Sequence, residues 1–272
     1  MLSACVTVLG PTISGFFVTA QLGLDQTGIY AIATAIAVMV SIPYRSMSSI
    51  VQPELAKASK EKDTVKLNLL VRQVAAVLMW VALVLLALIW INIDVIFAIL
   101  PNGNIYAPAR YVILFLGIGN LLQASFSLVG SVLSFSRYYY YSIFFSLILA
   151  VVTIGLNNWL IPLIGINGAA VATCTAYGIY FITLLSAVWI KLKVSPLSAS
   201  LWKIVLMAIA MAVADIFLSR LFGNMDLYGS AVLRTVLIVG GACLVSYYIR
   251  IVPELNLFAD KWLSRITNKS KG

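Results

Sequence analysis

Continuous apolar runs of about 20 residues recur along this chain, and they restrict its fold more than any other feature. A helix of that length crosses a hydrocarbon core about 30 Å thick and satisfies its own backbone hydrogen bonds in lipid. Strands of a membrane β-barrel would instead alternate apolar and polar residues over about 10 positions. The chain is 62% hydrophobic and only 10% charged, with a mean hydropathy of +1.04, whereas a soluble domain is about 25% charged. The sequence therefore predicts an all-α membrane protein, a polytopic bundle of eight transmembrane helices near residues 2–22, 27–48, 69–91, 111–134, 138–156, 166–190, 201–221 and 229–249.

Lysine and arginine residues are distributed unequally between the two sides that eight spans define. Of the 18, all but Arg110, Arg220 and Arg234 fall on the side that holds both termini. The positive-inside rule therefore places both termini, and a long loop predicted at 49–68, in the cytoplasm. Within this loop, residues 53–68 could form an amphipathic helix on the inner leaflet or a cytoplasmic helix between the second and third spans. The net charge of +9 follows from this asymmetry and from contact with anionic headgroups, so we expect the lipid bilayer as a partner and no nucleic acid.

The run NNWLIPLIGINGAAVAT, residues 157–173, places a proline, two glycines and three asparagines between two apolar spans. Counting spans puts its first half on the outer side, where water can satisfy an irregular backbone. Pro162 has no N–H and is predicted to end the span or to shape the turn, while Gly165 and Gly168 permit a tight turn. The small residues 169–173 then offer a surface on which a neighbouring helix can pack closely. By itself this run indicates a well-formed helical hairpin.

The same run is similar to the late-helix motif of the bacterial polysaccharide-biosynthesis flippases. These O-antigen and capsule oligosaccharide flippases belong to the multidrug/oligosaccharidyl-lipid/polysaccharide (MOP) exporter superfamily. LGLDQTGIYAIA (22–33) resembles the outer turn into the family's eighth helix, and IPYRSMSSIVQPELAKA (42–58) resembles the passage from that helix to a basic cytoplasmic loop. The three motifs occur in the family's order, and the resemblance covers about 1–195. It implies structural roles for Gly28, Tyr30, Pro43, Pro53, Asn157, Pro162, Gly165, Gly168, Ala169 and Thr173.

The resemblance also implies a division of the chain. Family members have twelve to fourteen helices in two lobes, with a substrate cavity between the lobes, and this chain aligns with the second lobe. We therefore expect a six-helix C-terminal transporter lobe (1–190), an additional two-helix hairpin (191–250) and a cytoplasmic amphipathic tail (251–272). A missing N-terminal lobe, in a partial sequence or a truncated gene, follows from this alignment. An Asp-Arg pair that is frequent in the family is replaced here by Ser14 and Gly15.

The function implied is translocation of lipid-linked oligosaccharide repeat units from the cytoplasmic to the outer leaflet of a bacterial inner membrane. The partner would be a polyprenyl-diphosphate-linked glycan, and the chain would need its first lobe to transport it. This task requires no covalent chemistry, and no enzyme, cofactor or metal is expected: the sequence has no histidine and no paired-carboxylate or phosphate-loop motif. The three cysteines, Cys5, Cys174 and Cys243, are widely spaced inside spans and are interpreted as buried thiols.

Polar residues inside the spans are candidates for the wall of a substrate cavity. Thr7, Ser14 and Gln21 are seven residues apart and fall near one stripe of the first span, where they could bind sugar hydroxyls or join helices to one another. Arg45 could engage a diphosphate or extend to the cytoplasmic headgroups. A third polar group, in the fourth span, consists of Asn120 and Gln123, which could face the cavity or pack between helices.

Asp215 is the clearest ionisable residue inside a span. A carboxylate at that depth costs about 3 kcal/mol on insertion scales and usually has a partner. Arg234 lies at a matching depth on the following span, so the sequence predicts an intramembrane ion pair between the two residues. Arg220 lies on another side of the same helix as Asp215 and is the poorer partner. The pair could be structural or could couple transport to protons.

Three other functions remain open at this point. A drug or cation antiporter of the same superfamily would share the fold, but it requires carboxylates in the cavity, and the first six spans offer only Asp25 and Asp94 near their outer ends. A membrane glycosyltransferase or polymerase requires catalytic residues in outer loops that are short here. A non-transporting remnant or partner subunit would explain a missing lobe.

Overall fold

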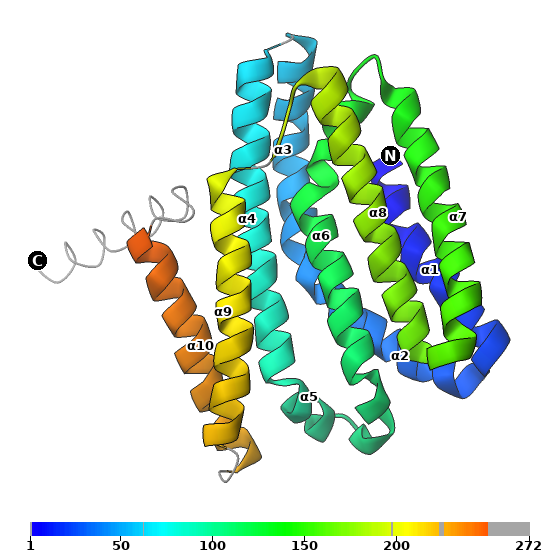
Figure 1. The fold of residues 1–272 in the computed structure, drawn as a ribbon, viewed down its shortest axis with the longest axis vertical. Coiled ribbons are helices and arrows are strands. Elements are labelled where there is room, and N and C mark those ends of the chain that lie inside the picture. Colours follow the sequence, from blue (N-terminus) through cyan, green and yellow to red (C-terminus); the bar gives the residue numbers. More distant parts are fainter. Residues whose placement is uncertain (1, 62, 197, 223–225, 250–272) are drawn as a thin grey trace, which may run out of the picture.

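The computed structural model describes the backbone of residues 2–61, 63–196, 198–222 and 226–249, and the side chains in these ranges from residue 10 to residue 248. The predicted amphipathic tail, residues 251–272, lies outside this part. The described chain is helical, with long helices lying side by side (Figure 1). The helices are α1 (Leu2–Leu22), α2 (Leu24–Val38), α3 (Ile42–Lys60), α4 (Thr64–Ile91), α5 (Ile93–Ile99), α6 (Arg110–Ser134), α7 (Tyr139–Ile164), α8 (Ile166–Leu192), α9 (Ala199–Leu221) and α10 (Leu227–Ile249), with 3₁₀ turns η1 (Met39–Ser41) and η2 (Gly103–Ala109).

The predicted all-α membrane bundle is confirmed. Among the described residues, seven helical segments are long and apolar enough to cross a membrane, with α2, η1 and α3 counted as one segment from Leu24 to Lys60. The 21-residue helix α1 coincides with the first predicted span, so these segments and α1 together cover the eight predicted spans. The chain is a multi-pass membrane protein.

Helix α6 lies at the centre of the bundle, where it packs on α2, α3, α4 and α8. Small residues make these contacts close. A Cβ atom added at Gly117 would lie 2.5 Å from Leu86 Cδ1, and one added at Gly119 would lie 3.1 Å from Tyr177 Cδ2. Membrane helices associate largely through such close van der Waals packing, because lipid offers no hydrophobic driving force between them. The sequence of α6 therefore favours a buried position.

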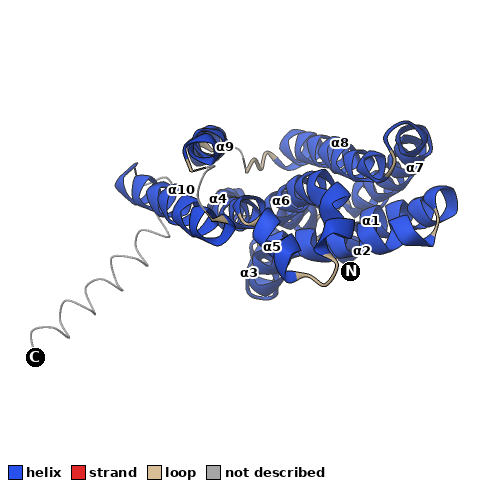
Figure 2. Cartoon of the chain, turned by 90° about the horizontal axis from the view of Figure 1, so that it is seen from below, coloured by secondary structure: helices blue, strands red, loops and turns tan. Residues whose placement is uncertain are grey.

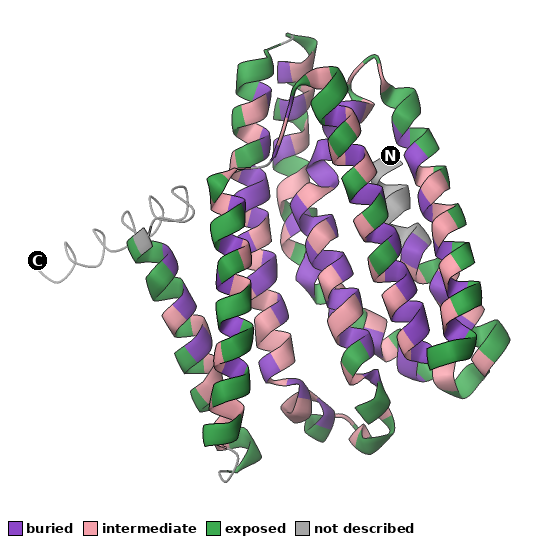
Figure 3. Ribbon diagram, in the orientation of Figure 1, coloured by how far each residue is buried: buried purple, intermediate pink, exposed green. Residues whose placement is uncertain are grey.

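Helices α9 and α10 pack on each other and on α4, to one side of the other helices (Figure 2). Their surfaces are largely exposed, as are those of α7 (Figure 3). Because these exposed faces are rich in leucine, isoleucine, valine and phenylalanine, they are suited to contact with lipid. At the C-terminal end of α4, Asn92 Nδ2 donates a hydrogen bond of 2.9 Å to Thr235 Oγ1 of α10.

The connections alternate between the two ends of the bundle (Figure 1). The ends of α3, α6 and α8 lie at one end of the bundle, and those of α4, α7 and α9 at the other. Two predicted connections are shorter than expected. The segment 49–68 is mostly helical, because α3 continues to Lys60 and α4 begins at Thr64. Residues 157–164, expected in an irregular outer segment, form the last turns of α7.

Candidate functional site

Four buried polar side chains from four helices meet inside the bundle; we call this group the polar cluster. It consists of Ser14 of α1, Tyr30 of α2, Asn157 of α7 and Thr173 of α8. Ser14 Oγ and Thr173 Oγ1 are 2.7 Å apart, and Asn157 Nδ2 donates to Ser14 Oγ at 2.9 Å. The Tyr30 side chain of α2 is 2% exposed and lies close to Ser14 and Thr173. The hydrogen bonds of the cluster join α1 to α7 and α8.

The hydrogen bonds of the polar cluster are supplemented by bonds to the backbone. Asn157 Nδ2 also donates to the Thr153 carbonyl at 2.7 Å, and Thr173 Oγ1 to the Ala169 carbonyl at 2.9 Å. Within the described part of the chain, Tyr30 Oη and Asn157 Oδ1 have no hydrogen-bond partner. A side-chain hydrogen bond between membrane helices contributes about 0.6 kcal/mol on average, so the cluster adds specificity to the packing more than it adds stability.

The turn between α7 and α8 brings Asn157 and Thr173 to the same depth. Gly165, the residue between the helices, has a φ of +60°, which strongly favours glycine. A Cβ atom on Gly168 would lie 2.3 Å from the Leu160 carbonyl oxygen, so only glycine allows α8 to begin this close to α7. Pro162 lies in the last turns of α7, where one lost backbone hydrogen bond is tolerated. The motif 157–173 thus encodes a hairpin and two members of the polar cluster.

The other motif residues have varied surroundings. Gly28 is exposed on α2, whereas Ala169 is buried on α8. Pro43 occupies the first turn of α3 after η1, where its missing N–H costs no helical hydrogen bond. Pro53 lies inside α3 and is exposed.

The remaining predicted cavity residues are dispersed. The side chain of Thr7 lies outside the described part, and Gln21 is exposed at the end of α1. Arg45 is exposed on α3. It lies fifteen residues before Lys60, the last residue of α3, which corresponds to about 22 Å along the helix axis. Asn120 is buried and donates to the Leu116 carbonyl, and Gln123 is buried with no described partner for either amide atom.

Asp215 and Arg234 form an ion pair between α9 and α10. Arg234 Nε donates to Asp215 Oδ1 at 3.1 Å, and Nη2 of the same guanidinium contacts the same oxygen. The two side chains are only 12% and 15% exposed. Asp215 also lines a cavity of about 410 Å³ between α4, α6 and α9, whose other walls are apolar. In such apolar surroundings an ionised carboxylate is stable only when a basic partner compensates its charge.

A second ion pair was not expected from the sequence. Arg110 at the start of α6 donates from Nη1 to Asp94 Oδ1 at 3.0 Å and from Nη2 to Asp94 Oδ2 at 3.2 Å. The guanidinium also lies over the Trp90 ring, 5.3 Å from its centroid. Both charged side chains are about two-fifths exposed. The contact forms because the chain folds back through α5 and η2. The sequence has no local pattern that predicts this fold-back, so it did not predict the ion pair.

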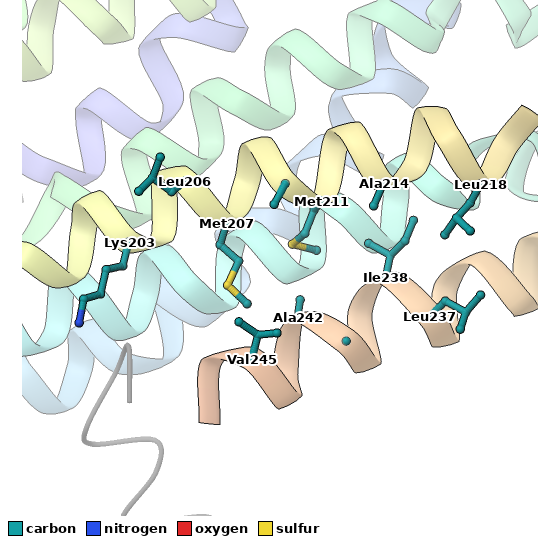
Figure 4. Close-up of a pocket in the computed structure, with 12 residues that line it drawn as sticks. Lys203, Leu206, Met207, Met211, Ala214, Leu218, Leu237, Ile238, Ala242 and Val245 are labelled. Atoms are coloured by element: carbon teal, nitrogen blue, oxygen red, sulfur yellow. The ribbon is translucent and has the colours of Figure 1, made fainter. Parts of the chain in front are cut away.

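An apolar groove runs between α9 and α10 on the outer surface of the bundle (Figure 4). Its volume is about 460 Å³, and Lys203 stands near one end. The residues along α9 from Lys203 to Leu218 extend for about 22 Å. The groove is therefore longer than the hydrocarbon half-thickness of one leaflet, about 15 Å. The other lining residues are Leu206, Met207, Ala210, Met211, Ala214, Leu218, Leu237, Ile238, Gly241, Ala242 and Val245.

Comparisons with known proteins returned matches only among solved structures. No protein-family model and no curated protein matches the chain. A MOP superfamily transporter from Pyrococcus furiosus is 17% identical, with a TM-score of 0.48, over 96% of this chain and 66% of that one. A MATE transporter in complex with Br-NRF is 17% identical, with a TM-score of 0.47, over 96% and 69%. The Vibrio cholerae MATE transporter VcmN, in its bent form, is 15% identical, with a TM-score of 0.45, over 96% and 70%. The chain thus spans about two thirds of the length of these proteins.

Proposed function

We propose that this chain is the second lobe, with an additional helical hairpin, of a MOP superfamily transporter that translocates lipid-linked oligosaccharides across a bacterial inner membrane. The observation that carries the proposal is the polar cluster. Tyr30 belongs to the first of the three motifs that resemble the polysaccharide flippases, and Asn157 and Thr173 belong to the third. Residues more than a hundred positions apart in these motifs meet in one buried group, as expected if the motifs describe one architecture.

The polar cluster gives this lobe a defined mechanical role. By joining α1 to α7 and α8, it favours movement of these helices as one body. Transporters built from two related halves expose a central site alternately by rocking one half against the other. In this proposal the glycan and diphosphate cross in the cavity between this lobe and a first lobe, and Arg45, exposed on α3, meets the diphosphate.

The groove between α9 and α10 supports a lipid-linked substrate over a soluble one. It is apolar, opens on the lipid-facing surface and has a lysine near one end. These properties suit an isoprenoid chain that remains in the membrane while its headgroup is translocated. In this orientation both termini lie in the cytoplasm, on the side where the positive charges are concentrated.

The proposal is tested with proteoliposomes that contain this chain together with a first lobe, and with liposomes that contain either part alone. The substrate is a fluorescent polyprenyl-diphosphate oligosaccharide, and translocation is measured as the fraction of label protected from a membrane-impermeant quencher. We expect translocation only when both lobes are present. Arg45→Ala should slow it, as should Ala210→Trp, which fills the groove.

Val213→Trp is the matched control for the groove, because Val213 is exposed on α9 but does not line it. Equal rates for Ala210→Trp and Val213→Trp would remove the groove from the mechanism. Efflux of a cationic drug coupled to a sodium or proton gradient, without translocation of the glycan, would overturn the proposal and favour an antiporter.

A further inference from the structure

A polar pocket lies at the basic end of the bundle, apart from the polar cluster and from the groove. Its volume is about 440 Å³, and it is bounded by the end of α3, the start of α4, the turn between α6 and α7, and the end of α8. Its polar lining consists of Ser59, Thr64, Ser136, Arg137, Tyr138 and Lys191. We call it the basic pocket.

Two cations of the basic pocket converge on one aromatic ring. Arg137 lies over the Tyr138 ring at 4.8 Å from its centroid and donates from Nη2 to the Tyr138 hydroxyl at 2.6 Å. Lys191 Nζ lies 5.9 Å from the centroids of both Tyr138 and Tyr141. In the described part of the chain, neither cation has a carboxylate partner. Two like charges held near one ring repel each other, and an anion bound between them would relieve that repulsion.

The walls of the basic pocket are joined by hydrogen bonds. Ser59 Oγ of α3 donates to the Phe135 carbonyl at 3.4 Å, which connects α3 to the turn between α6 and α7. Asn68 of α4 donates to the Lys193 carbonyl and accepts from the Ser195 N–H, and Arg72 donates to the Ser195 carbonyl. These bonds hold α3, α4, the turn between α6 and α7, and the residues after α8 together around the pocket.

The nearest acidic side chains do not neutralise the basic pocket. Glu61 and Asp63 are exposed in the connection between α3 and α4, and neither lines the pocket. The Asp63 carboxylate already accepts a hydrogen bond from the Lys66 N–H as the cap of α4. The charge presented to a ligand is therefore positive.

The surface of α7 next to the basic pocket carries an exposed apolar stripe. It consists of Tyr140, Phe144, Leu147 and Val151, which are spaced at three to four residues and are all exposed. Residues at this spacing share one face of a helix. The stripe begins about 200° around the helix from Tyr138, so it lies on another side of α7 from the basic pocket. It shows that α7 faces lipid next to the pocket.

We propose that the basic pocket binds the phosphate of an anionic phospholipid from the leaflet at that end of the bundle. Basic pockets between transmembrane helices are known to bind anionic headgroups. The Arg137 fork and the Lys191 ammonium pair with the phosphate, and the hydroxyls of the pocket complete its hydrogen bonds. This site is independent of the proposed transport function.

The test measures binding of phosphatidylglycerol to the purified full chain in detergent by native mass spectrometry, with phosphatidylcholine and inorganic phosphate as comparison ligands. We expect preferential binding of phosphatidylglycerol. Arg137→Gln with Lys191→Gln should weaken it about 30-fold, since each basic residue near an anionic surface contributes about a fivefold factor. Arg137→Lys, which keeps the charge, should retain most of the affinity.

Lys57→Gln with Lys66→Gln is the matched control, because it removes two exposed charges at the same end of the bundle but outside the basic pocket. It should change the affinity less than threefold, within the range expected for screened surface charges. Melting temperatures without added lipid verify that every variant is folded. Equal binding of phosphatidylcholine, wild-type affinity in the Arg137/Lys191 variant, or full competition by inorganic phosphate would each overturn the proposal. Because no transport is measured, these outcomes are separate from those of the flippase test.

Discussion

At the scale of single residues, Asn157 is the member of the polar cluster that joins α7 to α1. Its side-chain nitrogen donates both to Ser14 and to the Thr153 carbonyl. Asn157→Leu preserves the branched shape of the side chain but removes the bond between helices, so we expect a loss of about 1 kcal/mol or more in the free energy of unfolding. Unfolding in mixed micelles measures this. Asn158→Leu, one position along and exposed, is the control and should be nearly neutral. A larger loss at 158 than at 157 would contradict the role given to the cluster.

The Asp215–Arg234 ion pair belongs to the same scale. Asp215→Asn alone leaves the mostly buried Arg234 without a counter-charge, and we expect it to cost about 3 kcal/mol, whereas Asp215→Leu with Arg234→Met should recover much of that loss. Micellar unfolding of the single and double variants gives the coupling energy. Asp94→Asn, at the more exposed pair with Arg110, should cost less than about 1 kcal/mol. Additive effects at 215 and 234 would show that the two charges do not interact.

At the scale of elements, the hairpin of α7 and α8 depends on one close approach. Gly168→Ala would place a methyl group 2.3 Å from the Leu160 carbonyl oxygen, so one helix must shift, and we expect a loss of about 2 kcal/mol. Gly178→Ala on the same helix meets nothing within 4 Å and should be neutral or slightly stabilising, since alanine favours helix more than glycine does. Thermal unfolding of the two variants compares them directly. Equal melting temperatures would mean that the hairpin tolerates separation.

At the scale of the whole molecule, the alternating connections predict which residues face which side of the membrane. Ser136 lies at the basic end of the bundle and Asn104 at the opposite end. In a variant with Cys5, Cys174 and Cys243 replaced by serine, a cysteine at 104 should react with a membrane-impermeant maleimide on intact cells, and one at 136 should react only after permeabilisation. The reverse pattern of labelling would invert the orientation.

Much of the architecture was accessible from the sequence because the physical constraint is simple. A lipid-exposed backbone must form helices, and the length of an apolar run sets the length of a span. The ion pair of Asp215 with Arg234 was predicted by similar reasoning. An acidic and a basic side chain at the same depth of a membrane attract each other strongly. The ends of the helices were harder to predict from the sequence. Proline usually interrupts a helix, yet Pro53 and Pro162 both lie within helices. Proline inside a membrane helix is tolerated, because neighbouring groups can satisfy the backbone group that it leaves free.

The sequence by itself determined that this protein resides in a membrane, where its spans lie and which end of the bundle carries the positive charge. Apart from Asp215 and Arg234, only the tertiary structure decided which polar residues meet. Ser14 and Asn157 are separated by 143 positions, and Arg137 and Lys191 come from different helices, so neither pairing has a local signature. Spacing along one helix shows which residues share a face, but the partner of that face depends on how all the helices pack together.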